Sequence, residues 1–476
     1  MINQQFIYKH WSILLIILLT PLLLWGTILI LPTHDDWTSL TTPHFEPFFI
    51  KEHFLFYGYH WRPFDTWIGY IVGRNPQLLY PAFNHICVII GHTLCTWLIY
   101  RLLNILKFNP ISCNITTLFF FLAPATMATV LAVDSQNQVF ASVWGIVAFL
   151  YYIKNHKAKY ILWPVIIFIT TLSKENGLMW TLICPILAYG FDFIDKKTLK
   201  KDIIIGIAIM IVYALAIILL PKNIIIHPDY VPEDAKIIKN VIKFLYSSFF
   251  IVDYIYLLHQ PNRNLLLAGI TLLLTIPFLY YVFIRKMQLF IQRKAVCTLI
   301  CLIIAVGPHL ITVYSMMHTY AGLSFVCILF ANAINDYKNH TKKLIYTYCL
   351  FIITAIGIDI HLWKASYDSG LIGKRMAQEA ISKTGSPVDH VNIIIIEDDY
   401  PKLSSFCVIP NDAFGWGRAA QYETNYQWPK TVKDTTIERS EDAIIKAKEL
   451  GVEMLKRKQY DCVWIVNHDY IDVIKK

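Results

Sequence analysis

Charged residues are scarce in this chain. They make up 16% of its 476 residues, whereas soluble domains usually carry about 25%. Apolar residues make up 56% and the mean hydropathy is +0.48, which argues against an ordinary soluble globular protein. Apolar runs of about 17 to 25 residues recur up to Trp363, and runs of this length can span a bilayer. The composition therefore predicts a polytopic α-helical membrane protein.

Three further sequence signals are absent, and each absence argues against a class of protein. There is no CxxC spacing, so a zinc ribbon or a thioredoxin-like redox motif is not expected. There is no basic stripe with interleaved aromatic residues, so the net charge of +9 does not indicate nucleic-acid binding. The first apolar run, 11–30, has no small-residue cleavage site, so we expect a retained helix and not a signal peptide.

The apolar runs predict about eleven membrane-spanning helices. Their approximate ranges are 12–31, 83–103, 111–131, 139–153, 160–172, 177–191, 203–220, 264–284, 296–315, 320–335 and 343–362. Lysine and arginine are concentrated in alternate loops, which the positive-inside rule assigns to the cytoplasm. We therefore expect an inner-membrane protein with a cytoplasmic amino terminus and a periplasmic carboxy-terminal domain. Residues 240–264 are expected to form an interfacial helix on the outer surface.

Four polar clusters fall on the predicted outer face. They are His34, Asp35, Asp36 and Trp37; the segment "YGYHWRPFD" (57–65), with Tyr59, Trp61 and Arg62; the segment "LSKENG" (172–177), with Lys174 and Glu175; and the segment "HLITVYSMMHTY" (309–320), with His309, His318 and Tyr320. Ionised side chains at a membrane edge are costly unless they are paired or functional. Each cluster alone is also compatible with a solvated loop, a snorkelling arginine or a polar helix turn, so the hypothesis of a site depends on their convergence.

These residue types suit transfer of a sugar from a phosphate-linked donor. A carboxylate can take a proton from an acceptor hydroxyl as a general base. Arginine can hold a phosphate through two hydrogen bonds, and lysine can hold one as a point charge. Aromatic side chains such as Trp37, Tyr59 and Trp61 can stack on the apolar face of a sugar. His85 and His92, seven residues apart in one helix, are expected to be packed core histidines.

The order of these elements resembles the GT-C superfamily of polyprenyl-phosphate-sugar-dependent glycosyltransferases, in particular its protein O-mannosyltransferase-like branch. A first helix that ends in an Asp-Asp pair, then "HWRPFDTW", "FNHICVIIGHTLCTWLIYRLL" and "ITTLSKENGLMW" are similar to that branch's motifs. The resemblance covers residues 10–362. The segment "MMHTYAGLSFVCILFA" has a histidine where the family pattern has an arginine, which puts phosphate binding at that point in doubt.

The resemblance implies a function for each cluster. It implies an inverting transfer on the outer leaflet, with Asp35 as the general base and Asp36 orienting Asp35 or the acceptor. Arg62 and Lys174 would hold the donor phosphate. Glu175, together with His34, His318 and Tyr320, would position the acceptor or a metal. A divalent cation is compatible with the family but is not required by this sequence, so the cofactor stays unknown.

A rival hypothesis is a transporter or flippase for a lipid-linked or small anionic substrate. Such a protein should carry ionisable residues at helix midpoints and broken helices in paired positions. Here most of the charge lies in loops and no internal repeat is visible, so the sequence favours the enzyme. The expected partners are a polyprenyl-phosphate-linked sugar donor, membrane lipid and a glycan or protein acceptor.

Residues 366–476 predict a soluble α/β domain that follows the membrane module of residues 1–365. The segments 391–398, 404–410 and 460–467 are β-like runs, and 367–385 and 440–459 are helical. Glu397, Asp398 and Asp399 follow the first of these strands, where α/β sheets commonly bind ligands, although a solvated strand end fits equally well. Cys407 and Cys462 could form a disulfide in a periplasmic domain or remain buried thiols.

Overall fold

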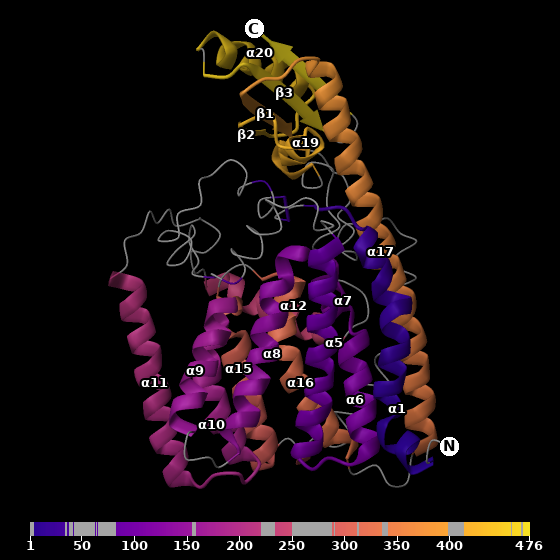
Figure 1. Cartoon of the computed structure of the whole chain (residues 1–476), viewed down its shortest axis with the longest axis vertical. Helices are drawn as coiled ribbons and strands as arrows, with labels where there is room; N and C mark the ends of the chain where they lie inside the picture. The colour runs from indigo at the N-terminus through magenta and orange to yellow at the C-terminus, as the bar shows by residue number, and fades with distance from the viewer. Residues whose placement is uncertain are drawn as a thin grey trace.

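The structure is a computed structural model of the chain. It describes residues 4–33, 36–37, 41, 62, 64, 82–154, 159–219, 234–249, 288–289, 291–311, 314–335, 341–397, 414–457, 459–467 and 470–476. The described part forms a bundle of helices followed by a small mixed β-sheet region (Figure 1). The two parts have separate hydrophobic cores.

The bundle is built mainly from long apolar helices. In chain order these are α1 (Gln4–Leu19), η1 (Thr20–Leu24), η2 (Trp25–Leu29), α5 (Ala82–Ile105), α6 (Pro110–Leu122), α7 (Pro124–Leu131), α8 (Gln136–Tyr152), α9 (Lys159–Ser173), η4 (Glu175–Met179), α10 (Trp180–Gly190), α11 (Lys196–Leu219), α12 (Asp234–Phe249), α15 (Arg293–Leu310), η7 (Met316–His318), α16 (Thr319–Ile334) and α17 (Thr341–Thr384). Among the described residues, five helical segments are long and apolar enough to cross a membrane, or six if the bent pair α6 and α7 is one span. The length and composition of these helices indicate a multi-pass membrane protein.

Every predicted span that the structure describes contains helix. The range 264–284 lies outside the described residues, and the other ten ranges each contain helix. Several of these helices are short, with 17 residues in α8, 15 in α9 and 11 in α10, whereas a span needs about 20. Length therefore keeps α8, α9 and α10 out of the set of candidate spans, whereas α11, which has 24 residues, is not excluded by its length.

Two of the spans are interrupted near prolines. The pair α6 and α7 bends by 44° between Leu122 and Pro124, and the first span passes through a π-helical turn, η1, that contains Pro21. Proline has no N–H to donate to the preceding turn, so it commonly kinks a helix. The membrane part is therefore not a set of uniform straight rods.

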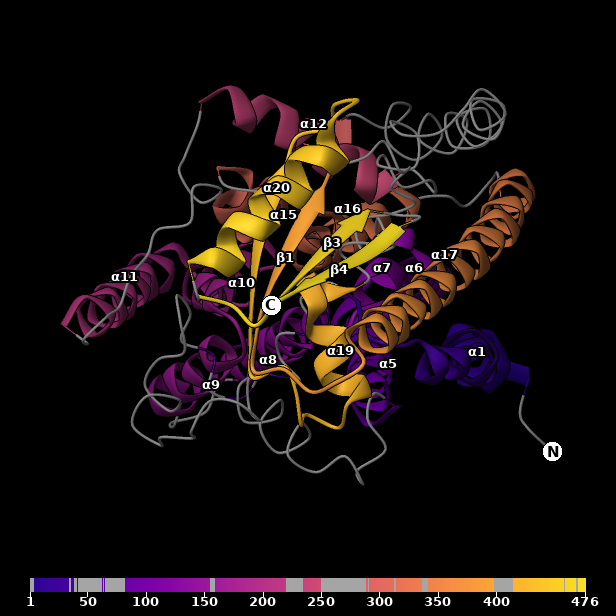
Figure 2. The same ribbon diagram turned by 90° about the horizontal axis from the view of Figure 1, so that it is seen from above.

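The helix α12 is amphipathic. It buries Asn240 and Phe244 and exposes Ile238, Ile242 and Leu245, which lie on one face at helical spacing. The Asn240 Nδ2 donates to the Leu310 carbonyl oxygen over 2.9 Å, so this helix is attached to the end of α15. Figure 2 shows it lying across the edge of the bundle. It covers the first part of the predicted interfacial segment 240–264, and residues 250–264 lie outside the described part of the chain.

The helix α17 joins the two parts of the molecule. Its 44 residues make a rod about 66 Å long at 1.5 Å per residue, far more than the ~30 Å hydrocarbon core of a bilayer. Phe351 and Leu362 belong to the core of the bundle, and Met376 and Ala380 belong to the core of the C-terminal domain. The helix passes position 365 without a break, so one rigid element carries the domain above the bundle (Figure 1).

The C-terminal domain is a four-stranded mixed sheet of order β2-β1-β3-β4. Its strands are β1 (His390–Ile396), β2 (Thr431–Ile437), β3 (Cys462–Asn467) and β4 (Tyr470–Lys475); β4 is antiparallel to β3, and the other neighbours are parallel. Alternate residues of the central strands face opposite sides. Ile393 and Trp464 pack towards α17 and α19 (Arg418–Glu423), whereas Ile394 and Val463 pack towards α20 (Ala443–Lys456). Figure 2 shows α20 and α19 on opposite sides of the sheet.

The sequence predicts the central strands of this sheet and misses the two edge strands. The segments 391–398 and 460–467 match β1 and β3, and the predicted helix at 440–459 matches α20. The predicted strand 404–410, with Cys407, and Asp398 and Asp399 lie outside the described residues. Cys462 is a buried free thiol, and burial raises its pKa to about 11.

Candidate functional site at one end of the helical bundle

The turn "LSKENG" is held in a fixed shape by close packing. The helix α9 ends at Ser173, and the 3₁₀ helix η4 starts two residues later, at Glu175. The Gly177 N–H donates to the Lys174 carbonyl oxygen over 2.9 Å. A Cβ atom on Gly177 would lie only 2.6 Å from the Thr170 carbonyl carbon, so the turn needs glycine here. The chain therefore presents Lys174 and Glu175 from a tight corner between two helices.

Glu175 is paired with Arg62 from the first long loop. The Arg62 Nε lies 3.0 Å from each carboxylate oxygen of Glu175, and Nη2 lies 2.9 Å from Oε2. The two side chains are 19% and 32% exposed. This two-point geometry fixes the orientation of the guanidinium plane. Two residues that are 113 positions apart, and that the sequence assigns to one site, are thus in direct contact.

Lys174 is turned into the bundle, where it is 5% exposed. Its Nζ donates to the Asn137 Oδ1 over 3.2 Å. Asn137 lies in the first turn of α8, within the polar run "VDSQNQ" (133–138) between two apolar segments. Polar residues at such a position are a functional signal in a membrane protein, but the sequence-based assignment gave this run no role.

Two histidines complete the group. The imidazole rings of His309 and His318 are stacked, with centroids 4.1 Å apart and planes 9° apart. The Asn176 Nδ2 lies 3.4 Å from the His309 Nε2, which joins His309 to the turn that carries Lys174 and Glu175. The structure therefore links His318, through its stacked partner His309, to the turn "LSKENG". It also adds Asn137 and Asn176, to which the sequence assigned no role, and gives His309 a contact within the site.

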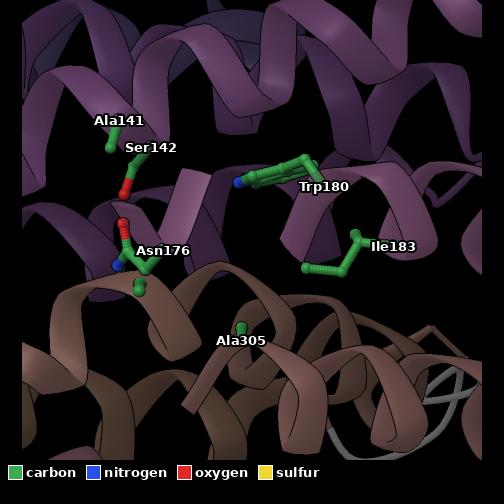
Figure 3. A pocket seen from close by; sticks show the side chains of 7 residues that line it. Ala141, Ser142, Asn176, Trp180, Ile183 and Ala305 are labelled. Atoms are coloured by element: carbon green, nitrogen blue, oxygen red, sulfur yellow. The ribbon is translucent and has the colours of Figure 1, made fainter. Parts of the chain in front are cut away.

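A small cavity lies beside this group. Its volume is about 10 Å³, roughly the room that one water molecule needs. It is lined by Ala141, Ser142, Asn176, Trp180, Ile183, Ala305 and Ala321. In Figure 3 the side-chain oxygens of Ser142 and Asn176 point toward each other across the space. The cavity is too small for a sugar or a lipid phosphate, so it is not the substrate site.

Tyr320 lies in the interior of the bundle and not with the Arg62 group. It is 0% exposed, and its hydroxyl lies 3.0 Å from the His92 Nδ1. His85 and His92 are buried as well, and the His85 Nε2 lies 3.1 Å from the Ile30 carbonyl oxygen. Both histidines are packed core residues, as the sequence predicts. Tyr320 is not placed to position an acceptor in this arrangement.

The first polar cluster is described only in part. Asp36 is 5% exposed, its N–H donates to the Thr33 carbonyl oxygen over 3.1 Å, and its Oδ2 accepts from the Thr33 N–H over 3.4 Å. Trp37 is 3% exposed and belongs to the core of the C-terminal domain, so its ring is covered by protein and is not available to a sugar. His34, Asp35, Tyr59 and Trp61 lie outside the described residues.

Within the part of the chain that the structure describes, no three His, Cys, Asp or Glu side chains are grouped so that they could hold a metal ion. Comparison with known proteins finds no matching family model and no significantly similar curated protein. The function is therefore argued from the site itself.

Proposed function

We propose that this protein is an integral-membrane inverting glycosyltransferase with a GT-C-like fold. It would move a sugar from a polyprenyl-phosphate donor to an acceptor hydroxyl of a glycan, a lipid-linked glycan or a protein. The observation that carries the proposal is the contact of Arg62 with Glu175 at one end of the bundle, with Lys174 next to Glu175 in the same turn. Two cations and one carboxylate at the end of membrane helices suit a phosphate group that is tethered to lipid.

The reaction assigns a task to each residue. The acceptor hydroxyl attacks the anomeric carbon, the bond from that carbon to the phosphate oxygen breaks, and the lipid phosphate leaves. Asp35 takes the hydroxyl proton, and Asp36 orients the acceptor or Asp35. Arg62 and Lys174 stabilise the charge on the leaving phosphate. Glu175 keeps the guanidinium of Arg62 in one orientation before the donor binds.

The proposal also includes a topology. About eleven helices would cross the cell inner membrane, with the amino terminus in the cytoplasm. The phosphate site and the C-terminal domain would lie on the periplasmic side, because basic residues concentrate in the loops at the other end.

Donor binding to the purified protein in lipid nanodiscs tests the proposal. Lys174→Ala should weaken binding of a polyprenyl-phosphate sugar by about 10- to 100-fold, the equivalent of a charged hydrogen bond of about 1.5–3 kcal/mol. Lys364→Ala is the matched control, because Lys364 is 67% exposed in a surface pair with Asp368. Equal affinity of the Lys174 and Lys364 variants would remove Lys174 from the donor site.

A transporter or flippase remains the second candidate, and Asp359 favours it. Asp359 lies within the apolar span of α17, is 1% exposed, and has no hydrogen-bond partner for either carboxyl oxygen among the residues that the structure describes. Buried ionisable residues within spans and bent spans such as α6–α7 are features of transport pathways. Asp359→Asn should leave sugar transfer unchanged in an enzyme, whereas loss of substrate movement across proteoliposomes would establish the transporter.

A further inference from the structure

The C-terminal domain contacts the chain on both sides of the acidic pair. On the first side, Leu31 packs against Gly370 in α17. A Cβ atom on Gly370 would lie 2.8 Å from the Leu31 Cβ and 3.0 Å from its carbonyl oxygen. Only a residue without a side chain lets α17 approach the backbone this closely. The start of the stretch "LPTHDDW" is thereby fixed to the helix that carries the domain.

On the second side, Trp37 is inserted into the core of the domain. Its ring centroid lies 5.6 Å from that of Tyr422 in α19, and it belongs to the cluster that contains Phe414 and Trp464. A Cβ atom on Gly415 would lie 2.2 Å from the Trp37 Cδ1. Gly415 has a φ of +57°, a conformation that glycine adopts at little cost. These residues of the domain thus surround the Trp37 ring closely, and we call them the seat.

A polar contact at the edge of the seat fixes the chain after Trp37. The Thr41 Oγ1 donates to the Trp37 carbonyl oxygen over 2.8 Å, and the Arg418 Nη1 donates to the Thr41 Oγ1 over 3.2 Å. Arg418 and Thr41 are 377 positions apart in the chain. The contact is therefore tertiary, and it holds the first long loop to the domain independently of the tryptophan ring.

We propose that the C-terminal domain is a clamp that holds the chain at Leu31 and at Trp37 and so positions Asp36, the second residue of the acidic pair, for the reaction. The catalytic consequence rests on the proposed glycosyltransferase function, whereas the clamp itself rests on the contacts above. A general base must be held within about 0.5 Å of its productive position, and a 1 Å displacement can cost about 100-fold in rate. A loop segment held at both ends meets this requirement without direct contact between the domain and the substrate.

The test compares three variants of the full-length protein in nanodiscs. Trp37→Ala should lower kcat by about tenfold or more and leave donor affinity unchanged, because the donor contacts are made by other residues. Trp37→Phe, which retains an aromatic ring for the seat, should keep most of the activity. Ile394→Ala is the matched control: Ile394 is buried on the opposite face of the sheet, so it weakens the domain without touching Trp37.

Amide hydrogen exchange of the peptide containing Asp36 and Trp37 provides a readout that needs no activity. Exchange should rise in Trp37→Ala and in Gly415→Ala, and it should stay at the wild-type level in Ile394→Ala. Unchanged exchange in the first two variants would overturn the clamp. If the wild-type protein transfers no sugar but exchange follows this pattern, the clamp stands and the proposed function fails. If Trp37→Ala keeps the wild-type kcat in an active enzyme, the positioning role fails.

Discussion

Arg62 and Lys174 are both cations beside the same turn, yet their surroundings differ. Arg62 is partly exposed and is oriented by contacts of two of its nitrogens with Glu175, whereas Lys174 is buried and donates to an amide oxygen. A planar guanidinium can satisfy a carboxylate and present a defined edge to a phosphate, whereas an ammonium acts as a point charge. At the residue scale, Arg62 therefore contributes orientation and Lys174 contributes local positive charge.

This difference predicts that Arg62 cannot be replaced by lysine. Arg62→Lys keeps the charge but loses the two-point contact with Glu175, so we expect donor affinity to fall by at least tenfold. Isothermal titration or a fluorescent-donor assay in nanodiscs measures this. Lys383→Arg, in an exposed pair with Glu379 on α17, is a suitable control and should bind donor normally. Wild-type affinity in Arg62→Lys would show that charge alone is needed at this position.

At the scale of elements, the corner between α9 and α10 determines where Lys174 and Glu175 lie. Its shape depends on Gly177, because the backbone of Thr170 occupies the place of a side chain there. A larger residue must push η4 away from α9. Such a shift would move both site residues together, although neither of them has been changed.

Gly177→Ala should therefore impair donor binding by tenfold or more and lower the melting temperature. Gly357→Ala is the matched control, since Gly357 lies in α17 and a Cβ atom there meets nothing within 4 Å. It should leave both quantities unchanged or slightly raise stability, as alanine favours helix. Thermal unfolding followed by intrinsic fluorescence, together with the donor-binding assay, reports both effects. A fully active Gly177→Ala protein would contradict the proposed dependence on this corner.

At the scale of the whole molecule, the two chain ends lie at opposite ends of the structure. Figure 1 shows the amino terminus at one end of the bundle and the C-terminal domain beyond the other end. The helix α17 makes this separation rigid because it runs from the membrane part into the core of the domain. The clamp on Trp37 joins the domain to the chain that follows the first span, at the end of the bundle opposite the amino terminus.

We therefore predict that reporters fused to the two termini lie on opposite sides of the membrane. A periplasm-active phosphatase after Lys476 should be active, and the same enzyme before Met1 should be inactive. A third fusion after Asp195, directly before the lysine-rich first turns of α11, should behave like the amino-terminal one. Activity at both termini, or at neither, would overturn the proposed topology and the periplasmic site with it.

The sequence by itself determined the class of protein and most of its helices and central strands. Long apolar helical runs and the short, continuous apolar runs of β1 and β3 are local properties, because hydropathy follows from neighbouring residues. The edge strand β2 was missed, since all of its residues are exposed or half-buried and "TVKDTTI" has no apolar face.

Only the tertiary structure decided which of the candidate residues meet. It paired Arg62 with Glu175, gave Lys174 the unforeseen partner Asn137, and placed Trp37 in the core of a domain nearly 400 positions later in the chain. It also placed Tyr320 in the interior of the bundle, where its hydroxyl contacts His92. Such contacts join residues far apart in sequence, so they depend on how helices pack and where a loop returns. No local pattern carries that information.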